Sequence, residues 1–181
     1  MDTALAPTPR KLVFLDFDDV LCLNAPYGGY DVVAPDPPPD LYERLFAPSC
    51  ADLLRQINTA HAPQYIITTS WLRFLEKAGM TTLLHKTGLG FVAQGFHPQW
   101  EVTQNARETR ATAIERWLSA YSTGERFVIL DDTISGTGLL KSPRLKRHVV
   151  FCEVNRGLTS AHLDTVKGIL DRKGTHGGPS H

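Results

Sequence analysis

The chain has 181 residues, of which 42% are apolar and 21% charged, and its 19 basic and 19 acidic residues leave no formal net charge. This composition is typical of a folded globular protein and excludes a disordered or strongly basic one. The length suits one well-packed domain, so we expect a single domain over residues 1–181. Without a net charge, no global field draws the protein toward nucleic acid or an anionic membrane, although a local basic patch remains compatible with the sequence.

The amino terminus, MDTALAPTPRK, lacks the basic start and apolar core of a signal peptide, and no apolar run approaches the ~20 residues of a membrane span. Cys22, Cys50 and Cys152 lie far apart without a CxxC pair, which predicts reduced, buried thiols rather than disulfides or a zinc site. These features favour a cytoplasmic protein with no membrane partner. The sequence gives no indication of the oligomeric state, and residues 174–181 are expected to form a flexible tail.

Short apolar runs alternate with amphipathic stretches along the chain. The runs are continuous rather than alternating with polar residues, which favours an α/β fold with a Rossmann-like parallel sheet covered by helices on both faces. In chain order the pattern predicts a strand at 11–17, a helix at 50–61, a strand at 64–70, one or two short helices within 71–88, a short strand at 89–93, a helix at 108–121, strands at 126–132 and 147–154, and a helix at 160–173.

Two segments show neither the continuous apolar run of a strand nor the amphipathic pattern of a helix. Residues 24–40 are rich in Pro and Gly and follow the first strand, and residues 96–106 are similarly irregular. In an open α/β sheet, the loops beyond the carboxyl ends of the strands form the ligand crevice. Both segments are therefore candidate walls of a site, and for 96–106 a plain solvated connection is an equal alternative.

Polar side chains cluster where the predicted strands end. Because parallel strands bring their carboxyl ends to one edge of a sheet, these clusters should converge, and the helix at 108–121 could add an arginine. The residues are Asp16, Asp18 and Asp19 after the first strand, Thr68, Thr69 and Ser70 after the second, Asp131 and Asp132 after the strand at 126–130, and Arg110.

This set of side chains indicates phosphoryl chemistry. Clustered carboxylates suit a hard cation such as Mg²⁺, and hydroxyl and guanidinium groups suit phosphate oxygens. One Asp can attack phosphorus and a second can protonate the leaving oxygen. Each residue alone is more simply a turn former, a helix cap or a surface residue, but their joint placement favours the functional interpretation.

Three stretches carry a family resemblance. LDFDDVL resembles the first motif of the haloacid dehalogenase-like (HAD) superfamily, YIITTSW the second, and VILDD the fourth. The resemblance implies a HAD fold with Asp16 as nucleophile and Asp18 as acid/base. It also implies Mg²⁺ held by Asp16, the Asp18 backbone carbonyl and Asp131, with Asp132 as a further candidate. For the phosphoryl oxygens it implies Thr69, or Thr68 after a one-residue slip, and Arg110, with Arg107 as the alternative.

TTSW followed by Arg73, and the later NRGLTSAHLD, resemble the small HAD domains of Swiss Army knife RNA repair proteins. The family fold places a helical turn and a β-hairpin flap at residues 20–40, and the short Pro-rich excursion there implies an essentially capless site.

The expected activity is that of a Mg²⁺-dependent phosphohydrolase. Its substrate would be a phosphomonoester, with nucleic-acid ends, nucleotides and other phosphoesters all open. The alternatives are a phosphotransferase and a non-catalytic module that binds a phosphorylated partner or nucleic acid.

Overall fold

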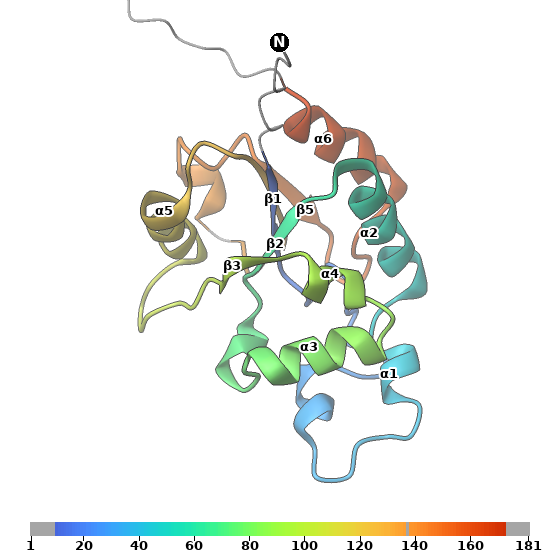
Figure 1. Ribbon diagram of the computed structural model, residues 1–181. Helices are drawn as coiled ribbons and strands as arrows, with labels where there is room; N and C mark the ends of the chain where they lie inside the picture. The colour runs from blue at the N-terminus through green and yellow to red at the C-terminus, as the bar shows by residue number, and fades with distance from the viewer. Residues whose placement is uncertain (1–9, 137, 173–181) are drawn as a thin grey trace, which may run out of the picture.

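Five parallel strands form one sheet at the centre of the protein (Figure 1). The computed structural model describes residues 10–136 and 138–172, so the tail expected at 174–181 lies outside the described residues. The sheet order is β3-β2-β1-β4-β5, so the chain leaves β1 to one side and later returns to its other side. The strands are β1 (Lys11–Leu15), β2 (Gln64–Ile67), β3 (Phe96–Glu101), β4 (Arg126–Asp132) and β5 (Val149–Cys152).

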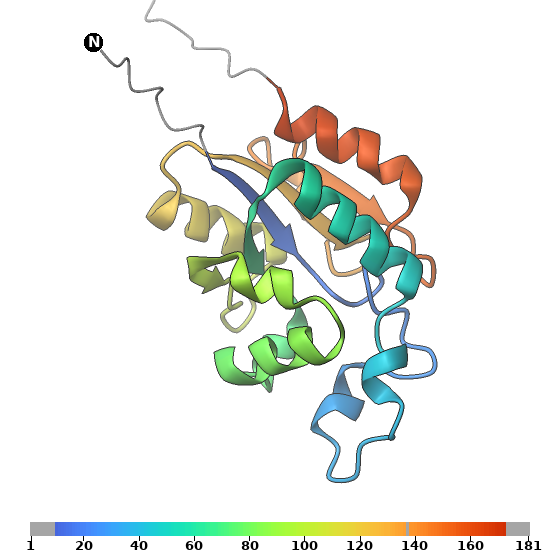
Figure 2. The same cartoon turned by 45° about the vertical axis from the view of Figure 1, so that its right-hand side comes forward.

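Helices cover both faces of the sheet, which confirms the predicted three-layer α/β architecture (Figure 2). Helices α2 (Pro48–His61) and α6 (Ser160–Leu170) pack on one face, and α5 (Arg110–Tyr121) packs on the other. On the α5 face the ring of Phe14 meets that of Trp117 edge-on, with 5.2 Å between their centroids. The apolar runs of β1 and β4 are thus buried from both sides, as continuous runs require.

The alternation of side chains along β1 and β4 determines the face of the sheet on which their terminal acids lie. Leu12 and Phe14 face α5, whereas Val13 and Leu15 face the core beneath α2 and α6. Since side chains of a strand alternate between faces, Asp16 continues the α5 face at the point where β1 ends. The same alternation in β4 places Asp131 on that face, after Ile129.

One region of the sequence prediction is wrong. Of residues 89–93, expected as a strand, Leu89 is the N-cap of helix α4 (Gly90–Gln94) and the others lie within it, and β3 lies in the segment expected to be irregular. A short apolar run does not distinguish a strand from a buried helix. Strand β3 lies at the sheet edge, contains Pro98 and pairs with β2 through a register shift, so it carries little of the usual strand pattern.

A small lobe lies beyond the carboxyl ends of the strands (Figure 1). It contains the short helices η1 (Gly29–Val33) and α1 (Leu41–Arg44) of the excursion after β1, and the turn η2 (Ser70–Arg73) and α3 (Lys77–Lys86) after β2. The excursion contains no β-hairpin, contrary to the expected flap, and only an isolated bridge pairs Asp18 with Cys22. It is too short for a cap domain, in agreement with the expected capless architecture.

The three cysteines are free and buried, as expected. Burial raises the pKa of the Cys22 and Cys152 thiols to about 12, so both hold their protons at neutral pH. Among the described residues, no helix has the length and apolar character needed to cross a membrane.

Candidate active site

The predicted site residues come together at the carboxyl edge of the sheet. Asp16 directly follows β1, and Asp131 and Asp132 end β4, the strand next to β1. Thr68 follows β2 on the other side of β1, and its backbone N–H donates to Leu15 O at 2.9 Å. The chain order reverses at β1 and β4, which is where open α/β sheets form their ligand crevices.

Three buried carboxylates share an unusual hydrogen-bonding pattern. In Asp16, Asp131 and Asp132, one oxygen accepts a backbone N–H, at 2.9, 2.9 and 2.6 Å respectively. The second oxygen of each, Oδ2, is buried without a hydrogen-bond partner. Each carboxylate offers a ligand atom, and these three atoms lie within 4.8 Å of one another. A buried carboxylate oxygen without a hydrogen-bond donor is costly, and one cation bound among the three would satisfy all of them.

Arg110 supplies the positive charge among these acids. Its guanidinium lies 3.6 Å from Asp16 Oδ2 and 3.7 Å from Asp131 Oδ2, and it also donates to the backbone oxygen of Thr68. Thr109 caps the amino end of α5 by accepting from Thr112 N at 3.1 Å, which fixes where the helix starts and hence where Arg110 points. Arg107, the alternative, is exposed and has a positive φ of 68°.

One guanidinium does not balance three buried carboxylates. Burial raises the pKa of Asp16 above its ordinary value, although Arg110 opposes the shift. Burial, against the opposing charge of Arg110, also raises the pKa of Asp131 to about 8, with Asp16 and Asp132 adding to the rise. With all three acids ionised, two negative charges remain beside Arg110, and a divalent cation would neutralise them.

The donor set fits a hard divalent cation. All three ligand atoms are carboxylate oxygens, the type that Mg²⁺ prefers, and within residues 10–136 and 138–172 no sulfur or imidazole ligand accompanies them. Asp18 does not join this cluster through its side chain. The residues expected to bind metal through their side chains are therefore Asp16, Asp131 and Asp132.

Thr68 and Thr69 both lie at the site but differ in their partners. The Thr68 hydroxyl is buried without a hydrogen-bond partner, whereas Thr69 Oγ1 accepts from Trp71 N at 3.4 Å and begins η2. Both line a hollow of about 210 Å³, together with Ser70 and Arg73. The hydroxyl of Thr68 is free to bind a ligand, and that of Thr69 retains its proton as a donor.

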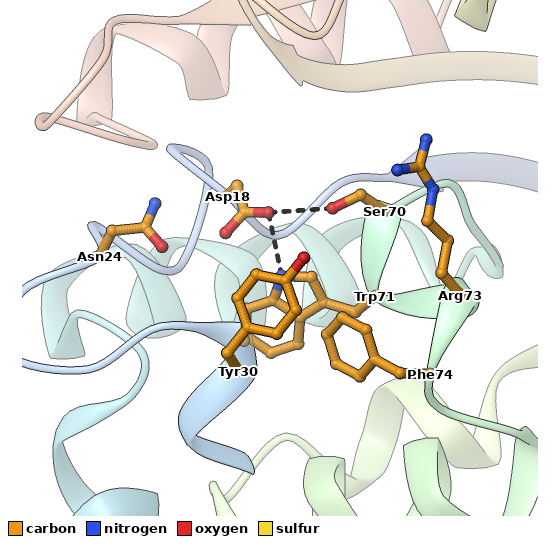
Figure 3. A pocket seen from close by; sticks show the side chains of 8 residues that line it. Asp18, Asn24, Tyr30, Ser70, Trp71, Arg73 and Phe74 are labelled. Atoms are coloured by element: carbon orange, nitrogen blue, oxygen red, sulfur yellow. Dashed lines mark hydrogen bonds between the residues drawn. The ribbon is translucent and has the colours of Figure 1, made fainter. Parts of the chain in front are cut away.

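Asp18 takes its contacts from the turn η2. It is half-buried, and its Oδ2 accepts hydrogen bonds from Trp71 Nε1 at 2.9 Å and from Ser70 Oγ at 3.4 Å (Figure 3). Burial and the neighbouring Asp16 charge raise its pKa, and the hydrogen bond from Trp71 opposes the shift. A carboxyl with a raised pKa can hold a proton for transfer.

Asp19 takes no part in this arrangement. Its backbone has a positive φ of 55°, and its carboxylate accepts from Asn155 N at 2.6 Å, which ties the turn after β1 to the loop after β5. Asp19 is therefore a turn residue whose carboxylate lies outside the acid cluster.

Sequence analysis missed the aromatic side of the site. Trp71 and Ser70 hold the Asp18 carboxylate, and Tyr30 and Phe74 line the pocket beside it. Ser70 and Trp71 are the last two residues of the second motif, YIITTSW, so their position in the sequence was a usable signal. Tyr30 carried no such signal, because its neighbours across the pocket lie about forty residues further along the chain.

Comparison with known families places the chain in a family. The model of a family described as the HAD domain in Swiss Army Knife RNA repair proteins matches residues 12–163, which is most of the chain. No curated protein and no solved structure matched in the corresponding comparisons.

Proposed function

The chain belongs to the family of HAD domains in Swiss Army Knife RNA repair proteins, and from this premise we propose that it is a Mg²⁺-dependent phosphohydrolase acting through an aspartyl-phosphate. Family membership supports phosphohydrolase chemistry at the level of the superfamily. The single observation that carries the proposal further is the convergence of three unpartnered carboxylate oxygens beside Arg110.

Asp16 is the proposed nucleophile. It stands at the end of β1, where its carboxylate faces the guanidinium of Arg110, which also donates to the backbone oxygen of Thr68. An Asp16 oxygen attacks phosphorus, the bond from phosphorus to the leaving oxygen breaks, and the phosphoryl group is held on Asp16. Arg110 and the hydroxyls of Thr68 and Thr69 would position the phosphoryl oxygens.

Asp18 is the proposed acid and base. Its carboxyl gives a proton to the leaving oxygen in the first step and takes one from water in the second. The water attacks phosphorus, releases inorganic phosphate and restores the Asp16 carboxylate. Trp71 fixes the orientation of the Asp18 carboxyl through its indole N–H, which serves both steps.

Mg²⁺ would be held by Asp16, Asp131 and Asp132, where it would neutralise charge on the phosphoryl oxygens and on the carboxylates themselves. Before it binds, the raised pKa of Asp131 means that protons compete for the same oxygens. The proposed substrate is a phosphomonoester, with a nucleic-acid end among the candidates.

Phosphate release from p-nitrophenyl phosphate, nucleotides and phosphorylated oligonucleotides, with Mg²⁺ or with a chelator, tests the proposal. Asp16→Asn should lower Mg²⁺-dependent release at least ~10³-fold while keeping a cooperative thermal transition. Asp164→Asn, an exposed position on α6, is the matched control and should behave as the wild type.

Near-normal turnover by Asp16→Asn would contradict its role as nucleophile. No Mg²⁺-dependent release from any substrate would instead favour a binding module. Transfer of phosphate to added alcohols in place of release would identify a phosphotransferase.

A further inference from the structure

A pocket of about 280 Å³ opens beside Asp18, between the excursion after β1 and the turn η2. Figure 3 shows the rings of Tyr30, Trp71 and Phe74 gathered on one side of it, with the polar groups of Asp18 and Ser70 on the other. Because Asp18 protonates the leaving oxygen in the proposed reaction, the leaving group must extend toward Asp18. The pocket therefore lies where the leaving group would be bound.

The rings of the pocket are stacked. Tyr30 lies over Phe74, with 5.4 Å between the ring centroids and 28° between the ring planes. Phe74 in turn stacks with Trp71, with 6.5 Å between the ring centroids and 27° between the ring planes. Gly29 allows this approach, since a Cβ there would lie 2.5 Å from Trp71 Nε1. Tyr30 is nevertheless 82% exposed, so most of its ring surface is open to solvent. An aromatic ring packed on one face and open on the other is a stacking platform for a planar ligand.

Arg73 provides a cation at the rim of the same pocket. It is exposed, and its guanidinium makes no ion pair and no hydrogen bond with any residue within 10–136 and 138–172. It also lines the adjoining hollow that contains Thr68 and Thr69. A guanidinium without a carboxylate partner, placed between the proposed phosphoryl subsite and the rings, suits a second phosphate of the same ligand.

On the basis of the proposed function, we propose that this pocket binds the leaving group and selects a nucleotide that carries a second phosphate. The base stacks on Tyr30, and the second phosphate pairs with Arg73. The ring platform extends from Trp71, which contacts Asp18, through Phe74 to Tyr30, so it suits a planar ring separated from the reacting phosphate by a spacer such as ribose. A phosphotyrosine, whose ring is attached directly to the leaving oxygen, fits this extent less well.

Matched substrates measure separately the stacking of the base on Tyr30 and the pairing of the second phosphate with Arg73. We compare kcat/KM for ribose 5-phosphate, adenosine 5′-monophosphate and adenosine 3′,5′-bisphosphate, which add first the base and then the second phosphate. A 5′-phosphorylated dinucleotide and a longer oligonucleotide distinguish a free nucleotide from a nucleic-acid end, and a phosphotyrosine peptide tests the other aromatic leaving group. We expect kcat/KM to rise at each addition along the nucleotide series, with base stacking contributing about 5- to 100-fold.

Substitutions in the pocket test the proposed roles of Tyr30 and Arg73. Tyr30→Ala should reduce the preference for adenosine monophosphate over ribose phosphate about tenfold, and Tyr30→Phe should retain it. Arg73→Gln should remove most of the preference for the bisphosphate over the monophosphate, and the wild-type preference should weaken as salt is raised. The controls are Tyr121→Ala and Arg147→Gln, exposed positions at the opposite end of the sheet, which should leave both preferences unchanged.

Binding is measured separately from turnover by calorimetry on Asp16→Asn with the same ligands. Equal binding and hydrolysis of ribose phosphate and the nucleotides, unchanged by Tyr30→Ala, would overturn the pocket assignment while leaving the phosphohydrolase intact. A higher kcat/KM for phosphotyrosine peptide than for every nucleotide would also overturn it. Absence of hydrolysis with every substrate, together with nucleotide binding that needs Tyr30, would overturn the proposed function alone.

Discussion

The two sides of the candidate site differ in burial and in how completely their polar groups are partnered. On the α5 side, Asp16, Asp131 and Arg110 are at most 4% exposed and contact one another. On the side of the excursion after β1, Asp18 is half-buried, and Tyr30 and Arg73 are largely open to solvent. The buried side is built from sheet and helix, and the open side from turns and short 3₁₀ helices.

This difference assigns the reaction to the α5 side and the recognition of the leaving group to the other side. Buried charges interact strongly because little water screens them, so the α5 side is suited to holding a metal and a phosphoryl group in fixed geometry. Exposed rings and cations on turns can adapt to a ligand, so the other side is suited to choosing the leaving group. Substitutions on the first side should therefore change stability and all turnover together, and those on the second should change individual steps or substrates.

Apart from the loss of the nucleophile in Asp16→Asn, the largest effect is expected from Arg110→Met. Among the residues that the structure describes, no other guanidinium contacts Asp16 and Asp131. Removal of the Arg110 guanidinium leaves buried carboxylates without a partner, so activity should fall at least ~10²-fold, and the free energy of unfolding near neutral pH by about 3–5 kcal/mol. Assays of phosphate release and urea denaturation measure both.

Arg107→Met is the matched control, because this arginine is exposed three residues earlier. It should change neither the activity nor the free energy of unfolding by more than a small amount. A larger loss of activity from Arg107→Met than from Arg110→Met would reverse the two assignments.

Asp131→Asn should abolish Mg²⁺ binding yet stabilise the metal-free protein, by about 1–2 kcal/mol at pH 8. Burial raises the pKa of Asp131 in the folded protein from 3.8 to about 8, so the folded state binds more protons than the unfolded state between these values. The contribution of this group to stability is present below about pH 4 and lost as the pH rises through about 8.

The stabilisation by Asp131→Asn should therefore grow from pH 5 to pH 9 in thermal melts recorded with a chelator. Added Mg²⁺ should raise the melting temperature of the wild type but not of the variant. If the variant proved less stable than the metal-free wild type at pH 8, the carboxylate would not be under the electrostatic strain that its burial indicates.

Trp71→Phe gives the smallest of these effects and tests the open side. It removes the indole N–H that holds Asp18, so kcat for alkyl phosphates should fall about tenfold, while p-nitrophenyl phosphate, whose leaving group needs little protonation, should lose less. This hydrogen bond lowers the pKa of Asp18, so its loss should shift the alkaline limb of the pH–rate profile to higher pH.

Trp117→Phe loses a comparable N–H bond, to Gln99 O at 3.0 Å, on α5 away from Asp18. It should reduce stability without changing the ratio of the two substrates. Equal losses for both substrates in Trp71→Phe would mean that Trp71 supports the fold but does not position Asp18.

The sheet and the acid cluster could be predicted because their signals are local. Continuous apolar runs identified β1, β2, β4 and β5, and acids directly after such runs had to meet at one edge of a parallel sheet. Strand β3 was missed because an edge strand that contains Pro98 and a register shift needs neither burial on both faces nor regular pairing. Its pairing depends on β2 and is not encoded in its own residue pattern.

The sequence by itself determined the chemical character of the site, because carboxylates, hydroxyls and an arginine at strand ends allow few reactions. Tertiary structure alone decided that Arg110 rather than Arg107 reaches the acids, since contact depends on where α5 starts and which way it faces. It also decided that Tyr30 lies over Phe74, forty-four residues away in the chain. Such contacts follow the path of the backbone through space, which no local periodicity records.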